Sequence, residues 1–281
     1  MHFASIPMII AACAAAMPVS AGTFEVTSEI GLAAEVVGDD LVPSEDTNRT
    51  FRLWAVTPEN WRIEAVVGNT EVGMRFEVTG GAFYQNEFGG PTSQQINEGF
   101  FSLVPELEWD SYLTIGALSS NSNDLNDIGI DWSSFDESGT LLEADNGTVF
   151  VTFEHSQGDA TTFTDGCGRS GHGVVIAQFT LVGEGASLEG SLLLQGRNDL
   201  NVTVQAHIPS FTIDADGISD ALPDGACAAD ITGDDQVDVH DLLHLLGNWY
   251  EGACEDITRD LLVDSDDVLH LINSWGACSA G

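Results

Sequence analysis

The region from residue 22 to residue 213 alternates between short apolar runs and gaps rich in Gly, Asn, Asp and Ser. In Phe51-Arg52-Leu53-Trp54, for example, large apolar and polar side chains alternate, which is typical of a strand that buries one face. The runs lie at residues 23–30, 50–56, 61–67, 72–79, 111–118, 148–155, 174–182, 188–195 and 201–208. No amphipathic helical pattern separates them, so the sequence predicts a mainly β domain. The expected fold is an antiparallel β-sandwich, with a jelly roll equally compatible because sequence does not fix strand order.

The pattern changes after a polar, turn-forming stretch at residues 214–225, which we interpret as a linker. In residues 226–281 the apolar side chains take up a helical spacing instead. Two sets recur at i, i+3, i+4 and i+7 and lie 26 residues apart: Leu242, Leu245, Leu246 and Trp249, then Val268, Leu271, Ile272 and Trp275. Each set predicts a short helix with one apolar stripe.

A twelve-residue acidic segment precedes each predicted helix, at 230–241 and 256–267, and the two segments align without gaps. Both carry Asp at positions one, five, nine and twelve and Thr at position three. In an EF-hand loop, positions one, three, five, seven, nine and twelve supply oxygen to calcium, position seven through its backbone carbonyl. The predicted calcium ligands are therefore Asp230, Thr232, Asp234, Gln236, Asp238 and Asp241 in the first loop and Asp256, Thr258, Asp260, Leu262, Asp264 and Asp267 in the second.

The paired loops, with Asp rather than Glu at position twelve and no long incoming helix, resemble a type I dockerin over residues 226–279. The resemblance implies a small all-α calcium-binding module that docks onto a cohesin-like partner module. Loop positions ten and eleven help to choose the partner in dockerins. Here they are Val239-His240 and Ser265-Asp266, where Ser-Thr is frequent in the family, so the resemblance does not carry over a particular partner.

The two loops depart from the usual pattern at position six, where a positive φ favours Gly. The first loop has Asp235 there and the second has Leu261, which adopts that conformation less readily than Asp. The second loop also has Arg259 among its carboxylates. We therefore expect the first loop to bind calcium and the second to be weaker or structural.

The first 21 residues are predicted to be a signal peptide. An apolar run at residues 3–17 is followed by Pro18 and by Val19-Ser20-Ala21, a small-residue cleavage site. The mature chain would begin at Gly22 and be secreted or held at the cell surface. Alternatively, residues 10–13 form a lipoprotein signal with the lipid on Cys13. No other stretch is long and apolar enough to span a membrane.

Charge restricts the classes of partner. The chain carries 45 acidic residues against 7 Arg and no Lys, for a net charge of -38. Nucleic acid is excluded as a partner, because binding phosphates requires cationic side chains. An apolar fraction of 43% is too high for a disordered acidic chain, so a packed fold is expected.

Four cysteines remain after cleavage, Cys167, Cys227, Cys254 and Cys278, and an even number in an exported protein predicts disulfides. None forms a CxxC pair, which argues against a thiolate zinc site. Dockerin-like modules bring their ends together, so the resemblance implies a bond between Cys227 and Cys278. Cys254 would then pair with Cys167 or stay free.

The β domain offers weaker candidates for chemistry. Glu106, Glu108 and Asp110 alternate before a predicted strand, an arrangement compatible with the paired acids of a glycosidase, but acidic residues are abundant throughout. The Gly-rich segment 168–173 contains Ser and His without a nucleophile elbow, and we expect a tight loop. His155 and His207 are expected to be isolated. Six aromatic residues are expected mainly in the core, with a few available to stack on sugars: Trp54, Trp61, Phe83, Tyr84, Trp109 and Trp132.

Two function classes follow from these patterns. The favoured one is a secreted calcium-binding protein whose tail docks to a cohesin-like or other extracellular partner and whose β-sandwich binds or scaffolds without catalysis. The alternative is a polysaccharide-active hydrolase or a carbohydrate-binding protein that its dockerin-like tail delivers.

Overall fold

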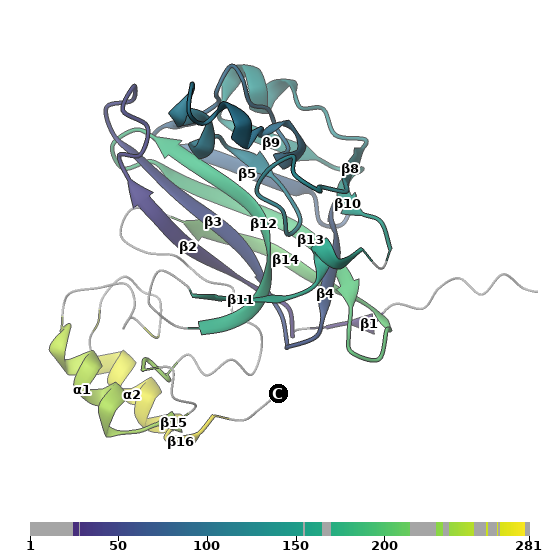
Figure 1. Ribbon diagram of the computed structural model, residues 1–281. Helices are drawn as coiled ribbons and strands as arrows, with labels where there is room; N and C mark the ends of the chain where they lie inside the picture. Colours follow the sequence, from purple (N-terminus) through teal and green to yellow (C-terminus); the bar gives the residue numbers. More distant parts are fainter. Residues whose placement is uncertain are drawn as a thin grey trace, which may run out of the picture.

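The computed structural model describes residues 25–27, 29–153, 155–164, 170–213, 229–232, 236–249, 257, 263 and 265–278. The predicted signal peptide and the linker at 214–225 lie outside this part of the chain. Up to residue 213 the chain forms two β-sheets, which lie one in front of the other in Figure 1. The prediction of a mainly β, sandwich-like fold is confirmed.

The larger sheet, sheet A, has eight strands. In spatial order six of them are β1 (Glu25–Val26), β14 (Thr203–Ile213), β13 (Ser187–Arg197), β4 (Arg62–Gly68), β10 (Gly147–Val151) and β8 (Leu125–Ile128). The strand β5 (Met74–Thr79) pairs with β13 and with β9 (Leu141–Ala144). All of these pairs are antiparallel except β1 with β14.

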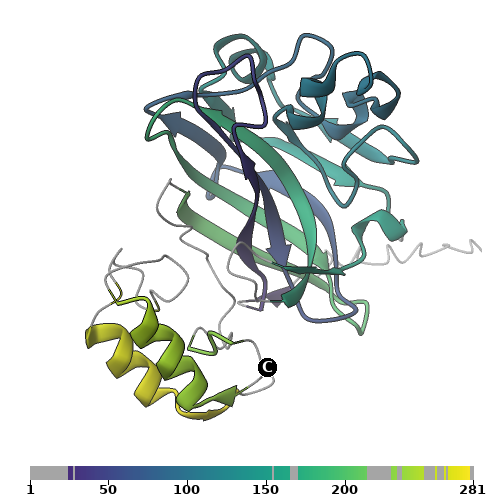
Figure 2. The same cartoon turned by 60° about the vertical axis from the view of Figure 1, so that its left-hand side comes forward.

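The second sheet, sheet B, has six strands, all paired antiparallel. Its spatial order is β11 (Thr161–Thr164), β12 (Ser170–Val182), β3 (Asn48–Val56) and β2 (Gly31–Asp39). Two short strands, β6 (Ala82–Phe83) and β7 (Tyr112–Leu113), also pair with β12. Figure 2, turned by 60°, shows the long strands of the two sheets as separate layers.

The core lies between the sheets and draws on both. Phe179 of β12 is fully buried, and its ring centroid lies 5.2 Å from that of Phe76 in β5. Phe51 of β3 and Phe83 of β6 pack on the same ring at centroid distances of 6.0 and 5.0 Å. Because this aromatic cluster joins strands from both sheets, it holds the two layers face to face.

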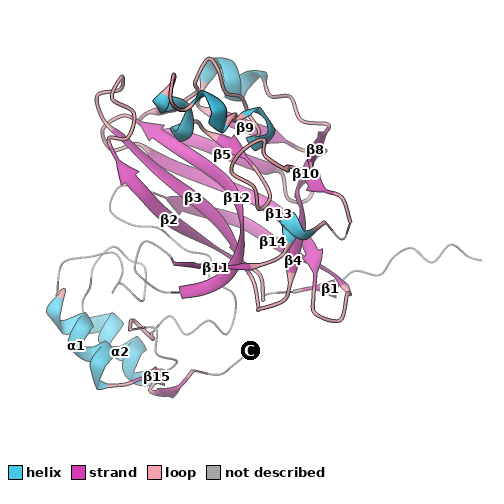
Figure 3. Cartoon of the chain, viewed as in Figure 1, coloured by secondary structure: helices cyan, strands magenta, loops and turns pink. Residues whose placement is uncertain are grey.

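Five short helical turns interrupt the strands: η1 (Ser93–Gln95), η2 (Glu98–Phe100), η3 (Pro105–Trp109), η4 (Ser134–Ser138) and η5 (Ser156–Gly158). Figure 3 shows most of these turns gathered at one end of the sheets. A separate cluster of Ile96, Leu107 and Tyr112, all buried, supports η1 to η3. The candidate acids Glu106 and Glu108 belong to η3, and Asp110 follows it directly.

Most of the long predicted strands are found, but one long strand is missed. The runs at 50–56, 61–67, 72–79, 174–182, 188–195 and 201–208 overlap β3, β4, β5, β12, β13 and β14. The strand β2 was not predicted, because Ala33 and Ala34 conceal its alternation. Both are buried, at 2% and 1% exposure, although neighbouring side chains of a strand point to opposite faces. Both faces of β2 are therefore covered at this point.

Three other predictions in this region need correction. The run at 111–118 contains only the two-residue strand β7, and the described residues of the run at 23–30 contain only β1. The Gly-rich segment is not simply a loop, since Ser170 to Gly173 belong to β12 and pair with β11. A Cβ on Gly173 would lie 2.6 Å from the carbonyl oxygen of Ala55 on β3. Close approach of two strands, rather than a turn, therefore requires this glycine.

The C-terminal part contains two nine-residue helices, α1 (Val239–Gly247) and α2 (Ser265–Asn273), which lie side by side in Figures 1 and 2. A two-stranded antiparallel ladder joins β15 (Gln236–Val237) to β16 (Gly276–Ala277). The two predicted helices are confirmed.

Candidate metal centre

The two repeats of the C-terminal module share one apolar core. Val237 and Val263, which correspond at the 26-residue offset, are 0% and 1% exposed. Leu245 of α1 and Leu271 of α2 also correspond, and both are completely buried. All four belong to a single cluster with Ala229 and Ile257. Equivalent positions of the repeat thus face each other, which explains why the apolar residues keep the same register in both copies.

Asp241 closes the first loop. Its Oδ1 accepts a hydrogen bond from the backbone N–H of Thr232 at 2.9 Å, and its Oδ2 accepts one from the N–H of Asp238 at 2.7 Å. Asp238 is the N-cap of α1, and its Oδ1 accepts from the N–H of His240 at 2.7 Å. The side chain of Asp238 also accepts from the backbone N–H of Asp241, and the reciprocal bonds between these two residues form a capping box that begins the helix immediately after the loop. Positions three, nine and twelve are therefore held together by one carboxylate.

That carboxylate is buried and negatively charged. Asp241 is 0% exposed, and so is Asp267 at position twelve of the second loop. Burial raises the pKa of Asp241, but the backbone N–H groups of Asp238 and Thr232 and the Thr232 hydroxyl lower it by more. The pKa of Asp241 therefore ends below its ordinary value, and the group is ionised at neutral pH. A buried anion of this kind is favourable only where hydrogen bonds or a cation compensate it.

Six of the twelve predicted calcium ligands lie in the described part of the chain: Asp230, Thr232, Gln236, Asp238, Asp241 and Asp267. The other six, Asp234, Asp256, Thr258, Asp260, Leu262 and Asp264, lie outside it. Among the described residues, no three acidic, His or Cys side chains gather closely enough to hold a metal ion.

The donor chemistry of the first loop nevertheless fits calcium. Asp230 is 8% exposed and Asp241 completely buried, so two carboxylates are already withdrawn from water at the two ends of the loop. Asp241 uses one lone pair on each oxygen for the backbone, which leaves acceptor capacity on both. Asp230 and Asp241 would ligate through carboxylate oxygens and Gln236 through its backbone carbonyl. Calcium would supply positive charge to compensate these carboxylates.

Cys278 lies beside this loop and is disulfide-bonded. Its Sγ is 3.7 Å from Oδ2 of Asp230, and its side chain packs against the module core. The other cysteines, Cys167, Cys227 and Cys254, lie outside the described residues. A disulfide at Cys278 is thus observed, and its pairing with Cys227 stays a prediction.

The predicted apolar stripes are only partly buried. Leu245 and Leu271 face the core, but Leu246 is 49% exposed and Ile272 51% exposed. Successive helical residues are turned by about 100°, so one residue beyond a buried position already faces away from the core. The exposed apolar residues of the two helices, here called the helix face, are Val239, Leu243, Leu246, Leu269, Ile272 and the adjoining Trp275.

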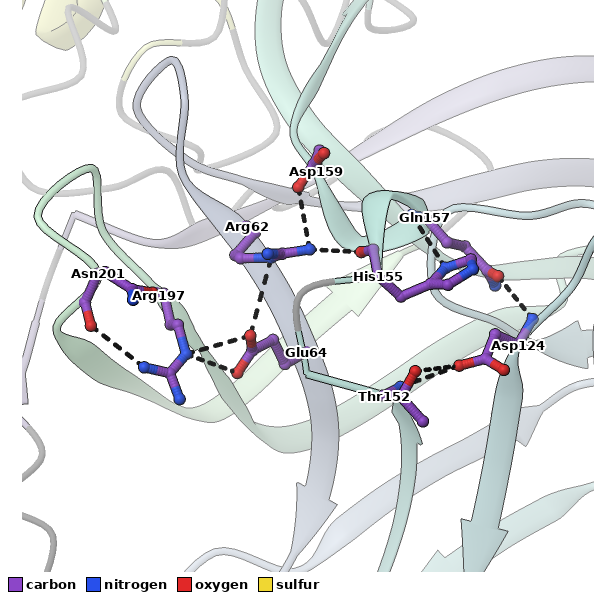
Figure 4. Close-up of polar contacts among 9 residues, drawn as sticks. All are labelled: Arg62, Glu64, Asp124, Thr152, His155, Gln157, Asp159, Arg197 and Asn201. Carbon is purple, nitrogen blue, oxygen red and sulfur yellow. Dashed lines mark hydrogen bonds and ion pairs between the residues drawn. The ribbon is translucent and has the colours of Figure 1, made fainter.

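A second cluster of polar residues lies at the end of sheet A (Figure 4). Glu64 of β4 stands between Arg62 and Arg197. The Nε of Arg197 lies 3.2 Å from each carboxylate oxygen of Glu64, and the Nε of Arg62 lies 3.7 Å from Oε1. Glu64 is 7% exposed. Partial burial strengthens these ion pairs relative to surface pairs.

A bulge in β4 produces this arrangement. The pairing of β4 with β13 passes from Ala65 opposite Gln195 to Ile63 opposite Gly196 and skips Glu64. A bulge turns the side chain of the extra residue away from the regular alternation. Ile63 enters the core, while Glu64 meets the arginines. In the sequence, the bulge is marked by Gly196, because a Cβ at this position would overlap the carbonyl of Arg62.

The arginines of this cluster are engaged by the protein itself. Arg62 also contacts Asp159, with 3.1 Å between Nη2 and Oδ1, and donates to the carbonyl of His155. Arg197 donates to the carbonyl of Asn201 at 3.1 Å and lies over the ring of Phe153. The cluster therefore joins two strands to two loops, and it presents no uncompensated positive charge to an anionic ligand.

The adjacent histidine is held by a backbone hydrogen bond. Nδ1 of His155 accepts from the backbone N–H of Gln157, and the nearby Thr152 hydroxyl donates to Asp124. The hydrogen bond from Thr152 is the main reason why the pKa of Asp124 is lowered. His207 is exposed on β14, as expected for a surface histidine.

The candidate acids Glu106, Glu108 and Asp110 do not line one face of a strand, which corrects the sequence analysis. Glu106 and Glu108 belong to η3, and Asp110 follows it as the C-cap. Residues two apart in a helical turn point in different directions. Ser44 donates to Glu106 through its backbone N–H and its hydroxyl, at 2.9 and 3.0 Å, so this carboxylate anchors a neighbouring loop.

Asp110 is completely buried and acts as an anchor for the loop before η1. Its Oδ1 accepts from the N–H of Asn86 at 2.8 Å and its Oδ2 from the N–H of Gly90 at 3.0 Å. Burial raises the pKa of Asp110 to about 7, although these backbone bonds oppose the change. A perturbed pKa often marks a catalytic acid, but this group has no surface open to a substrate.

Of the six candidate aromatic residues, three are buried, and Trp54, Trp109 and Trp132 are half-buried. Trp61, Phe83 and Tyr84 are buried, as expected. Trp54 is half-buried on sheet B, where its ring stacks on Phe163 at a centroid distance of 4.7 Å. Its Nε1 donates to Glu35 at 3.0 Å. Phe163 is itself buried, at 8% exposure, so Trp54 is the more open ring of this pair.

No family model, curated protein or solved structure matches this chain. In the described part of the chain, no helix has the length and apolar character needed to cross a membrane.

Proposed function

We propose that residues 226–281 form a calcium-dependent docking module and that the β-sandwich has a non-catalytic binding or scaffolding role. One observation carries this proposal: the two acidic repeats share a single core, and each places a completely buried Asp at position twelve of its loop. Chance acidity would not bury the same carboxylate twice in register. The type I dockerin resemblance of the sequence points to the same function.

The helix face supplies a surface for docking. Leu243 and Leu246 of α1 correspond to Leu269 and Ile272 of α2, and each of the four is about half exposed or more. Exposed apolar residues on two adjacent helices favour contact with another protein. The module has 12 acidic residues and one basic residue, so a suitable partner has an apolar patch with a neutral or basic rim. A cohesin-like module is the partner that we propose.

Two observations favour a non-catalytic sandwich. The carboxylates of the sheet A cluster are engaged by arginines, and the one carboxyl among the described residues with a raised pKa is sealed from solvent. Hydrolysis of a glycoside requires two carboxyl groups that reach the substrate. The stacked Trp54 supports carbohydrate binding as a second candidate, because sugars bind to partly exposed aromatic rings beside polar groups.

Calorimetric titration of the mature chain, residues 22–281, with calcium tests the first part. We expect binding in the millimolar range or tighter, with Asp230→Ala reducing it strongly and Asp256→Ala reducing it less. Absence of calcium binding would reject the proposed function.

Docking is tested by measuring binding to a panel of recombinant cohesin modules with and without calcium. We expect calcium-dependent binding that Leu246→Asp weakens. The matched control is Leu200→Asp, which changes an equally apolar residue, 77% exposed, on the sandwich. Equal effects of the two variants would exclude the helix face as the docking surface. A glycan array probed with residues 22–213 and with its Trp54→Ala variant tests the carbohydrate candidate.

A further inference from the structure

The last described residues of the chain pack against the first acidic loop. Gly276 pairs with Val237 and Ala277 with Gln236, so β16 forms an antiparallel ladder with β15. Gln236 and Val237 are positions seven and eight of that loop. Gln236, whose carbonyl is a predicted calcium ligand, is therefore held in place by a strand that follows α2, about 40 residues further along the chain.

Gly276 makes this return possible. Its φ is +128°, a conformation that residues with a Cβ rarely adopt. The helix α2 ends at Asn273, and β16 begins three residues later at Gly276. The C-terminal arm, residues 276–278, is thus directed onto the loop by a specific backbone turn.

Cys278 ends the arm against the first predicted ligand. Its Sγ lies 3.7 Å from Oδ2 of Asp230. Because the cysteine is disulfide-bonded, its sulfur carries no hydrogen to donate, and the contact is one of packing. The side chain is half-buried against the module core and Asp230 is 8% exposed, so the disulfide limits the positions that this carboxylate can take.

The second loop lacks an equivalent ladder in the described part of the chain. Val263, which corresponds to Val237, is buried but belongs to no strand. Within the described residues, the ladder of the arm is with the first loop.

From this geometry we infer that the disulfide at Cys278 and the strand β16 preorganise the first loop, so that the redox state of Cys278 controls its calcium affinity. The inference rests on the proposed function. With the arm in place, positions one and seven are ordered before calcium arrives. Once the disulfide is reduced, the arm can leave, and calcium binding must also order these residues, at a cost in conformational entropy. Reduction of a disulfide by a dithiol releases two thiols at the protein and oxidises the dithiol, so a thiol reductant is the required co-reactant.

The experiment measures the first loop alone. In a mature chain carrying Asp256→Ala, calorimetry with calcium is performed on the oxidised protein and after reduction with a dithiol. We expect reduction to raise the Kd of the first loop at least tenfold, and Cys278→Ser to raise it equally without reductant. In the control Asn273→Ala, which alters an exposed side chain of α2 outside the helix face, the Kd of the oxidised protein should stay unchanged.

Three outcomes separate the explanations. If calcium binds with the same Kd before and after reduction, the inference fails while the proposed function stands. If calcium does not bind the oxidised chain, the proposed function itself fails. Far-UV circular dichroism of the reduced chain should recover the helical signal at saturating calcium. Failure to recover it would overturn the inference, because the disulfide would then be needed for the fold rather than for the affinity of one loop.

Discussion

The backbone N–H of Thr232 donates to Oδ1 of Asp241 across nine residues of sequence, at 2.9 Å, and this bond closes the first acidic loop. The same carboxylate caps the N-terminus of α1 through Asp238. Loop closure and helix initiation therefore depend on one side chain. Calcium binding at this loop would consequently be coupled to formation of the helix.

Replacing Asp241 by Asn should weaken both functions of this side chain. An amide keeps the size but turns one acceptor into a donor, which then faces a backbone N–H. We expect a loss of about 1–3 kcal/mol in the stability of the module, with lower calcium affinity. Thermal melts at fixed calcium concentration measure the first effect and calorimetry the second. Asp267→Asn, at the equivalent buried position, is the matched variant, and a loss of calcium affinity as large as that of Asp241→Asn would refute the asymmetry between the loops.

Replacing Glu64 by Gln should destabilise the sandwich. The change removes the negative charge between two partly buried guanidinium groups, and we expect a loss of about 2 kcal/mol in the free energy of unfolding. Glu77→Gln is the control, because Glu77 also pairs with an arginine on sheet A, at 2.6 Å, but with both side chains about 40% exposed. That variant should cost less than about 1 kcal/mol. Urea denaturation followed by tryptophan fluorescence distinguishes them, and equal costs would contradict the importance of burial.

Asp110 should make the stability of the sandwich depend on pH. Its pKa is raised to about 7 by burial, whereas an unfolded Asp titrates near pH 3.9. Between about pH 4 and pH 7 the native state therefore binds one more proton than the unfolded state, so stability falls as pH rises. This contribution is complete below about pH 4 and is lost as pH passes through 7.

The comparison with Asp110→Asn isolates this contribution from that of the other carboxylates. Subtracting the two urea denaturation series at pH 4, 5.5 and 7 should leave a slope of at most about 1.4 kcal/mol per pH unit. The variant should itself be less stable, because an amide cannot accept from the N–H groups of both Asn86 and Gly90. Identical slopes for the two proteins would show that Asp110 keeps an ordinary pKa.

Gly116 should tolerate no side chain. Its φ is +72°, and a Cβ would overlap the carbonyl oxygen of Gln157. Gly185 has nearly the same φ, +71°, but no described heavy atom lies within 4 Å of the position that a Cβ would take there. Gly185→Ala should cost about 1–2 kcal/mol for the backbone conformation alone. Gly116→Ala should cost about 1–3 kcal/mol more, because it adds a steric clash. Equal losses in thermal melts would show that the loop of Gln157 moves aside.

The local patterns of the sequence determined the class of fold and the organisation of the tail. Alternation in residues such as those of β3 and β5 identified strands, since one face of each is largely buried and the other is more exposed. The 26-residue repeat identified both helices and the pairs of residues that meet in the module core, because the same register must bury the same positions twice. It also predicted Asp241 and Asp267 as the ligands at position twelve of the two loops, and both side chains are buried.

Only the tertiary structure decided which apolar and charged residues face one another. Local alternation could not reveal β2, whose small residues are covered on both faces, or the bulge that brings Glu64 between Arg62 and Arg197. The helical spacing placed Leu246 and Ile272 on an apolar stripe, but only the packing of the two short helices decides that they stay exposed. The contact of Cys278 with Asp230 joins residues 48 positions apart. Such relationships depend on how elements pack across space, which short-range periodicity does not encode.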